Sequence, residues 1–251
     1  TNQVLPIITK KDNKHPIAFG SSFLIEIYRG CYRGCKFCLI GCQNLPYRER
    51  SLDKLKQIIN ESSEKTNRSR ISFIGSAFSD YSKLEELLNF TYNKSFFPVI
   101  PSLRADRITK EIIDILYKSG AKSITMAPET ASNRLHENIG KGLDTNKIIE
   151  AANLIIKNRI EKIKLYFIFG LPSETINESL EIVDLIYKIS ELGYKKRNIS
   201  LSITPFIPKP HTEFQFDSQL PLKELLQRSK ILKKELNKNN FKADFYDPKW
   251  A

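Results

Sequence analysis

The sequence predicts an α/β fold in which six parallel strands and the helices between them form a partial (β/α)6 barrel. Six short apolar segments alternate with helical patterns at regular intervals, which is typical of right-handed parallel βαβ units. Many of these segments are apolar on both faces, as strands covered by helices are. Six units are too few for a closed eight-stranded barrel, so we expect the sheet to stay open.

Each element follows from a local pattern of apolar, capping and turn residues. Ser51 is expected to cap the first helix, and Gly120 to end the third one at its C′ position. The strands are expected at residues 21–28, 70–75, 97–103, 122–127, 162–169 and 198–206, with further short strands at 4–9 and 241–246. The helices are expected at 51–65, 81–93, 109–118, 133–138 with 145–158, 175–192 and 222–237.

The length and composition fit one large domain. The chain has 251 residues, 41% of them hydrophobic, which is enough for a sizeable core. We expect an N-terminal segment at 1–22, the barrel at 23–206, and a C-terminal extension at 207–251 that packs on the barrel. No run of about 18 apolar residues and no signal peptide is visible, so we expect no membrane span and a cytoplasmic location.

The net charge of +12 raises the question of nucleic-acid binding. Many of the basic residues are scattered along predicted helices, as Lys54, Lys56 and Lys65 are, and such lysines usually form solvated faces. RNA is therefore a less favoured partner than a small-molecule, lipid or protein substrate.

All four cysteines lie in one short stretch, which argues for a reducing compartment rather than a disulfide scaffold. Cys31, Cys35 and Cys38 have the spacing Cys-x3-Cys-x2-Cys. Three thiolates on one loop can hold three irons of a 4Fe–4S cluster and leave the fourth iron open. Glycines at 30, 34 and 41 suit a loop that wraps closely around an inorganic core. Cys42 leaves three alternatives: a zinc site with four thiolates, a closed electron-transfer cluster, or a plain buried thiol, which we favour.

The cysteine spacing, with Phe37 just before the third cysteine, resembles the signature of the radical S-adenosylmethionine (SAM) superfamily. The segments 26–31 and 47–51 are similar to the radical SAM core of cobalamin-binding-type, archaeal-like members. The resemblance runs from about Phe23 to the C-terminus. It implies a TIM-like partial barrel that carries the cluster, with SAM on the open iron. It also implies a reductant protein that supplies one electron.

The activity that this resemblance implies is cleavage of SAM to a 5′-deoxyadenosyl radical, for hydrogen abstraction or methylation of an unknown substrate. Cobalamin is expected only if a domain upstream binds it, since none fits before Phe23. Two alternatives remain open. One is an RNA-modifying, methylthiotransferase-like enzyme, although the chain shows neither the cysteines of a second cluster nor an appended RNA-binding domain. The other is a non-catalytic iron–sulfur electron-transfer protein.

The reactive groups of a parallel barrel gather at the C-terminal ends of its strands. After the second strand, the chain has Gly75, Ser76 and Ala77 where the superfamily often has Gly-Gly-Glu, whose backbone receives the amine of SAM. After the third strand come Ser102 and Arg104. Arg104 is expected to bind the SAM carboxylate or an acidic substrate, with a surface salt bridge as the alternative.

The fourth and fifth strands complete the expected SAM site. The resemblance implies that Glu129 binds the ribose hydroxyls, with a helix-cap role as the alternative. It places Phe37 and Ile168 against the adenine, and it implies close approach at Gly170.

Further candidates follow from strand alternation and from one rigid loop. Alternation puts Lys164 and Tyr166 on the same face as Ile168. Lys164 is then either a buried cation that needs an anion, from SAM or substrate, or a solvated residue at the bottom edge. His211, in a proline-rich loop at 205–214, and Tyr166 are the substrate-side candidates.

Overall fold

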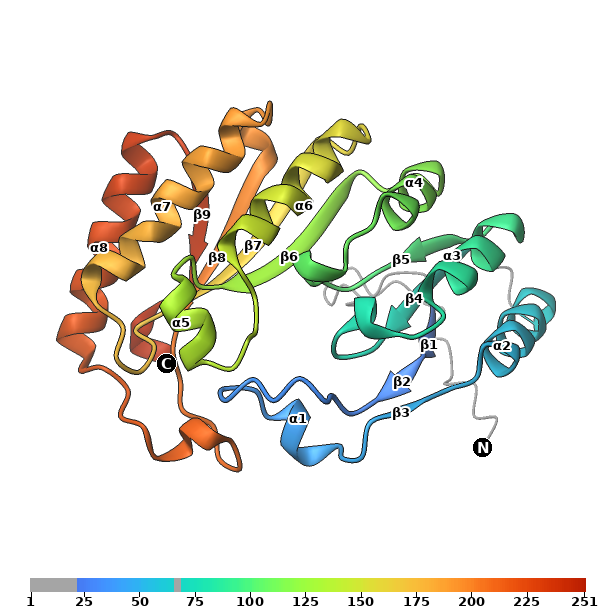
Figure 1. Ribbon diagram of the computed structural model, residues 1–251, viewed down its shortest axis with the longest axis horizontal. Coiled ribbons are helices and arrows are strands. Elements are labelled where there is room, and N and C mark those ends of the chain that lie inside the picture. The colour runs from blue at the N-terminus through green and yellow to red at the C-terminus, as the bar shows by residue number, and fades with distance from the viewer. Residues whose placement is uncertain (1–21, 66–68) are drawn as a thin grey trace, which may run out of the picture.

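The computed structural model describes residues 22–65 and 69–251 and shows an open, curved arrangement of parallel strands (Figure 1). One sheet has the order β1-β4-β5, and the other has the order β6-β7-β8-β9. A parallel bridge between Leu103 and Met126 joins them. The strands of these two parallel sheets are β1 (Phe23–Glu26), β4 (Arg70–Ile74), β5 (Phe97–Val99), β6 (Ser123–Glu129), β7 (Lys162–Phe169), β8 (Ile199–Pro205) and β9 (Lys242–Phe245). The predicted partial barrel is confirmed, and the extra strand predicted at 241–246 is β9.

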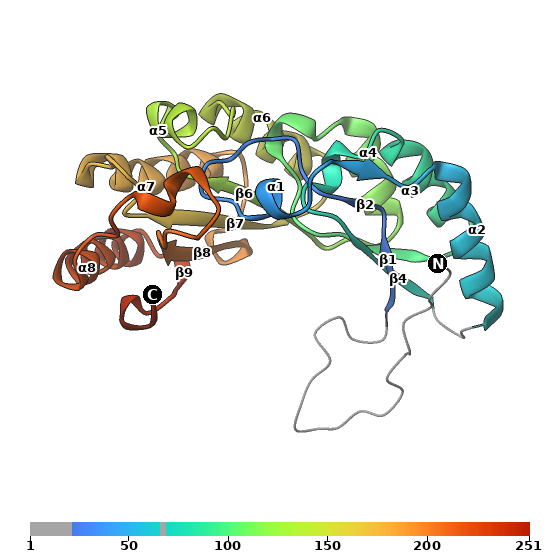
Figure 2. The same cartoon turned by 90° about the horizontal axis from the view of Figure 1, so that it is seen from below.

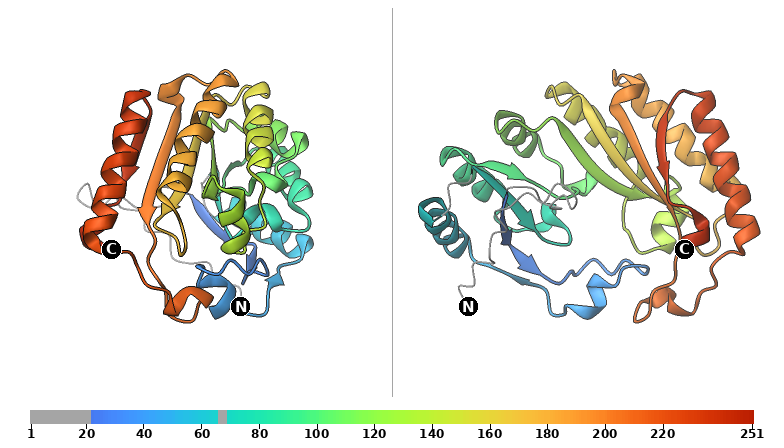
Figure 3. Two further views of the ribbon diagram at one scale, coloured as in Figure 1. Left: turned by 60° about the vertical axis from the view of Figure 1, so that its left-hand side comes forward. Right: turned by 180° about the vertical axis from the view of Figure 1, so that it is seen from behind.

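Helices cover the outer side of the curved strands (Figure 3). Ser51 Oγ accepts the Lys54 N–H at 3.3 Å, which confirms the predicted cap. Gly120 has a φ of +85° directly after its helix, as the predicted C′ position requires. The helices are α2 (Leu52–Lys65), α3 (Leu84–Asn93), α4 (Lys110–Lys118), α5 (Asn133–Asn138), α6 (Thr145–Lys157), α7 (Ile176–Glu191) and α8 (Leu222–Lys238).

Three predicted elements differ from the structure, each for a local reason. The first strand ends at Glu26, because the chain turns to form β2 (Tyr28–Arg29), which pairs antiparallel with β3 (Arg48–Glu49). The strand predicted at 97–103 is regular only as far as Val99 and pairs again at Leu103; Pro101, between them, donates no hydrogen bond to a ladder. The helix predicted from 81 begins at Leu84, after a 3-10 turn, η1 (Phe78–Asp80). The strand predicted at 4–9 lies outside the described residues.

Strand β7 shows how the two faces of the sheet differ. Ile163, Leu165, Phe167 and Phe169 are buried, whereas the residues between them are half-buried. The buried set faces the helices, so Lys164, Tyr166 and Ile168 face the interior of the open barrel. This confirms the predicted alternation.

The cysteine loop crosses the end of the barrel at which the strands terminate, and it contains the short helix α1 (Ile40–Gln43) (Figure 2). The C-terminal extension reaches the same loop, because the Phe214 N–H donates to the Lys36 carbonyl at 3.1 Å. Among the described residues, no helix is long and apolar enough to cross a membrane.

Candidate active site

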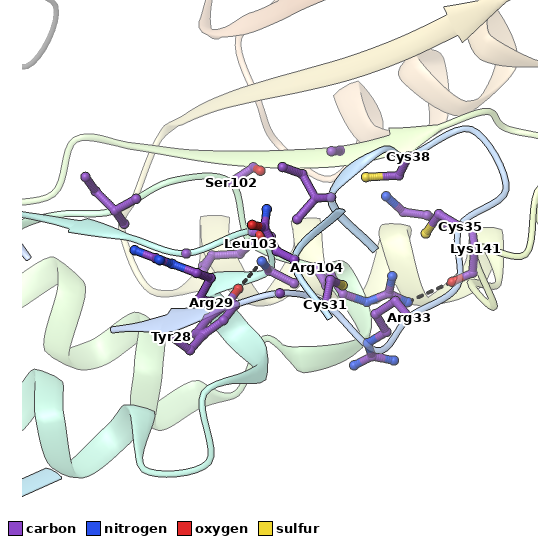
Figure 4. Close-up of a pocket in the computed structure, with 18 of the residues that line it drawn as sticks. Tyr28, Arg29, Cys31, Arg33, Cys35, Cys38, Ser102, Leu103, Arg104 and Lys141 are labelled. Carbon is purple, nitrogen blue, oxygen red and sulfur yellow. Dashed lines mark hydrogen bonds between the residues drawn. The ribbon is translucent and has the colours of Figure 1, made fainter. Parts of the chain in front are cut away.

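A cavity of about 520 Å³ lies where the cysteine loop faces the C-terminal ends of β4, β5 and β6 (Figure 4). This volume is in the range of small-molecule sites. Ten of the predicted site residues line this cysteine cavity: Cys31, Cys35, Phe37, Cys38, Gly75, Ser76, Ala77, Ser102, Arg104 and Glu129. The structure therefore brings together residues that lie up to about a hundred positions apart in the sequence.

The backbone of the loop depends on glycine at position 30. Gly30 has a φ of +86°, and a Cβ there would lie 2.4 Å from the Asn44 carbonyl oxygen. Gly34 also has a positive φ, of +66°, but a Cβ there would meet no atom within 4 Å. Position 30 thus needs glycine both for its conformation and for space, whereas position 34 needs it only for its conformation.

Cys42 is separated from the other three thiols. It lies on α1, is exposed, and is not part of the cavity wall; its Sγ lies 3.9 Å from the Cys38 carbonyl oxygen. The expectation of a buried Cys42 is therefore wrong, because α1 turns this side chain outward. All four cysteines are free thiols.

Two cations lie near the half-buried Cys35 thiol. Burial raises the pKa of the Cys35 thiol, while the nearby Lys141 and Arg104 act in the opposite direction. Burial also raises the pKa of the Cys31 thiol. The two cations favour the thiolate form that a metal cluster needs.

Tyr28 supports the segment that follows β4. Its buried hydroxyl accepts a hydrogen bond from the Ala77 N–H, and a Cβ on Gly75 would lie 2.6 Å from its ring. Gly75 is therefore required so that the tyrosine ring can lie flat beneath residues 75–77. Burial raises the pKa of the Tyr28 hydroxyl, which keeps it protonated.

Arg104 and Glu129, which line the cavity, each pair with an oppositely charged side chain. Arg104 is buried and forks onto the Asp106 carboxylate, with Nε 3.0 Å from Oδ1, and its Nη2 donates to the Lys141 carbonyl at 2.9 Å. Arg104 thus forms the salt bridge that was expected as an alternative, but this salt bridge is buried rather than on the surface. Glu129 Oε1 lies 3.0 Å from Lys141 Nζ, and Glu129 has a φ of +73°.

Lys141 is a site residue that the sequence reasoning missed. It stands between Gly140 and Gly142, which both have positive φ, and it lines the cysteine cavity. The sequence signal that could have indicated Lys141 is its place between two glycines, twelve residues after Glu129 at the end of a strand.

A second cavity of about 320 Å³ adjoins the first through Phe37, which lines both. Ile168, Thr204, Phe206 and Ile207 also line this second cavity. Phe37 and Ile168, which were predicted to contact one adenine, therefore share one wall of mainly apolar side chains.

Residues 25–186, more than half of the chain, match the radical SAM superfamily. The chain belongs to the radical SAM superfamily. It is 35% identical over 230 residues to the uncharacterized protein MJ0966 of Methanocaldococcus jannaschii; the match covers 91% of this chain and 50% of that protein. The chain thus spans about half the length of this relative.

Solved radical SAM enzymes share the fold. SuiB of Streptococcus suis bound to S-adenosylmethionine aligns with a TM-score of 0.62 at 16% identity, over 89% of this chain and 50% of SuiB. The methyltransferase TsrM of Kitasatospora setae, with cobalamin and a 4Fe–4S cluster bound, aligns with a TM-score of 0.60 at 14% identity, over 76% of this chain and 38% of TsrM. The predicted superfamily and its partial barrel are confirmed.

The donor set of the cysteine cavity fits the cofactors of the superfamily, a 4Fe–4S cluster and SAM. Three thiols line one wall, and a cubane spreads three thiolates over three irons. No three His, Cys, Asp or Glu side chains of residues 22–65 and 69–251 converge closely enough for one metal ion. The buried cations Arg104 and Lys141 and the half-buried Glu129 carboxylate offer both signs of charge to a zwitterion such as SAM.

Four predicted site residues line neither cavity. Gly170 is one of them: a Cβ there would lie 3.1 Å from Leu220 and from Leu225, so its missing side chain makes room for the C-terminal extension. Its N–H donates to the buried carboxylate of Glu174, whose pKa burial raises to about 7. The Glu174 carboxylate therefore binds the backbone of this turn, just before α7 begins.

The other three are Lys164, Tyr166 and His211. Lys164 Nζ lies 5.1 Å from the centre of the Tyr166 ring, and no carboxylate of the described residues pairs with it. Lys164 is half-buried, so it is neither the fully buried cation nor the fully solvated residue that were expected as alternatives. His211 is exposed, and its backbone N–H donates to Gln215 Oε1 at 3.1 Å.

Proposed function

We propose that this chain is the core of a radical SAM enzyme that binds a 4Fe–4S cluster and generates a 5′-deoxyadenosyl radical for hydrogen abstraction or methylation. The observation that carries the proposal is the common cavity wall formed by Cys31, Cys35, Cys38 and Glu129, with Cys42 outside it. When bound and reduced, the cluster supplies one electron that cleaves the sulfonium of SAM homolytically.

The three cysteines would hold the cluster and leave one iron for SAM. Residues 75–77 would receive the methionine amine on their backbone carbonyls, in a segment that the hydroxyl of Tyr28 supports. Arg104 and Lys141 would attract the methionine carboxylate, since both cations are buried in the same wall. All the charged groups of methionine would thus find partners near the thiols.

The nucleoside part of SAM would extend from the first cavity toward the second. Glu129 would accept hydrogen bonds from the ribose hydroxyls, and Lys141 holds its carboxylate in place. Phe37 and Ile168 would pack against the adenine, because both line the second cavity.

The electron balance requires a one-electron reductant, so a reductant protein is a necessary partner of this function. The radical would act on a substrate inside the open barrel, which Tyr166 and Lys164 face from β7. Lys164 would attract an anionic group of that substrate.

The binding part of this proposal is tested by anaerobic reconstitution with iron and sulfide. We expect the visible absorption of an iron–sulfur cluster, and an electron paramagnetic resonance signal of the reduced cluster that changes when SAM is added. Cys35→Ala should lose the signal and the control Cys42→Ala should keep it. A signal that SAM leaves unchanged would favour the electron-transfer alternative.

A further inference from the structure

Arg33 lies between the first two cluster cysteines and forks onto Asp80. Arg33 Nε donates to Asp80 Oδ2 at 2.7 Å, and Nη2 donates to Oδ1. The Asp80 side chain is only 1% exposed and that of Arg33 is 17% exposed. A side chain of the cysteine loop is thus tied to the turn η1 that follows β4, 47 residues away.

The same fork belongs to a group of charges at the strand ends. Asp106 Oδ2 lies 3.8 Å from Arg33 Nη1, and Asp106 also holds Arg104. Arg107 approaches Asp80 from the solvent side, with Nε 3.5 Å from Oδ1, and is half exposed. Arg33 is therefore the link between the cysteine loop and this group of charges.

The other side of the loop is held at Lys36, by two backbone hydrogen bonds and by an ion pair between Lys36 Nζ and Glu213 Oε2 at 3.7 Å. The Lys36 N–H donates to the Ile139 carbonyl at 3.0 Å, and the Lys36 carbonyl accepts the Phe214 N–H at 3.1 Å. Cys35 lies between these bonds and Arg33. The loop is thus anchored on both sides of the second cysteine.

We propose that the Arg33–Asp80 pair is a clasp that holds the cysteine loop in its cluster-binding conformation before the cluster is present. Arg33 acts as a positioning residue, since it would act on the cluster only through the loop. The proposal deepens the proposed function and rests on it for the identity of the bound group.

Physical chemistry explains why such a loop benefits from a clasp. Glycines at 30 and 34 increase the conformational freedom of the loop, so ordering it around a cluster costs entropy. A bidentate arginine–carboxylate pair fixes orientation as well as distance. The clasp would form before the cluster binds, so this cost would be met during folding and cluster insertion would be favoured.

The test is hydrogen exchange of the apoprotein, followed by mass spectrometry of peptides that cover residues 31–42. Arg33→Gln should raise exchange there by at least about tenfold, as expected for the loss of a charge-assisted hydrogen bond. Reconstitution of this variant with iron and sulfide should also slow. Arg107→Gln is the matched control, because it removes the other cation beside Asp80 and leaves the loop untouched.

Arg33→Gln leaves a buried carboxylate with less compensation, so the variant is expected to lose stability. The double variant Arg33→Gln/Asp80→Asn removes both charges. We expect its unfolding midpoint to recover while the loop stays unprotected. The proposal would be contradicted if the double variant regained both its unfolding midpoint and the protection of the loop. Unchanged hydrogen exchange in Arg33→Gln would also contradict it. The apoprotein measurement needs neither cluster nor SAM, so failure of the clasp is distinguishable from failure of the proposed function.

Discussion

Lys141 Nζ lies 3.0 Å from Glu129 Oε1, and both side chains are at most 14% exposed in the wall of the cysteine cavity. The lysine comes from the turn after α5, and the glutamate ends β6 with a left-handed backbone. His136 links the two: its Nε2 lies 3.1 Å from the Pro128 carbonyl, and its own carbonyl accepts the Lys141 N–H at 2.9 Å. A carboxylate and an ammonium are thereby fixed beside the thiols.

Glu129→Gln should weaken SAM binding by about 10- to 100-fold, since it removes charge-assisted hydrogen bonds to the ribose. The cluster content should not change, because the thiols are untouched. Isothermal titration of the reconstituted protein with SAM measures this. Glu137→Gln, at an exposed position on α5, is the control, and equal affinity in both variants would exclude Glu129 from the SAM site.

Gly30→Ala should reduce the cluster content after reconstitution much more than Gly34→Ala does. Both positions have positive φ and share that strain, but only the Cβ at position 30 would collide with backbone, at Asn44. Iron and sulfide analysis of the two variants gives the comparison. Equal loading of the two would show that the loop tolerates displacement near residue 44.

Tyr28→Phe should lower the free energy of unfolding by about 0.5–1.5 kcal/mol, because the half-buried Ala77 N–H loses its acceptor. Denaturant unfolding of the apoprotein measures the loss. Tyr32→Phe is the matched control on the same loop, since the ring of Tyr32 is 53% exposed. A Tyr28→Phe variant as stable as the control would mean that water replaces the hydroxyl.

Stability should fall as the pH is lowered from about 6.5 to about 4, in part because of His136. Burial, with Lys141 adding to it, lowers the pKa of this fully buried ring to about 4. The unfolded chain takes up the proton below its ordinary pKa of about 6.5, so the contribution is present above that pH and is lost as the pH falls. Its slope is at most roughly 1.4 kcal/mol per pH unit.

His136→Gln should flatten this part of the pH profile, measured as urea midpoints between pH 7.5 and 4.5. His211→Gln is the control, because His211 is exposed. If His136→Gln leaves the slope unchanged, the proton is taken up elsewhere.

The strands could be predicted from the sequence because their apolar character on both faces is local information. The cysteine loop could be predicted because the spacing of its cysteines is also local information. The gap in pairing between Val99 and Leu103 was harder to predict, since it depends on where Pro101 falls relative to the neighbouring strands.

The site was predicted less completely, because its charged pairs join distant segments. Arg33 and Asp80 have no shared pattern in the sequence, and the same is true of Arg104 and the carbonyl of Lys141. At Gly170 the sequence predicted a contact that the structure does not show. The resemblance implied close approach to SAM, whereas the Cα of Gly170 faces Leu220 and Leu225.

The most direct test of the central claim is SAM cleavage by the reconstituted, chemically reduced chain under anaerobic conditions. The account predicts 5′-deoxyadenosine and methionine in equal amounts, detected by mass spectrometry. Cleavage should vanish in Cys31→Ala, Cys35→Ala and Cys38→Ala and should persist in Cys42→Ala. Intact SAM after full reduction of a loaded cluster, or a requirement for Cys42, would contradict it.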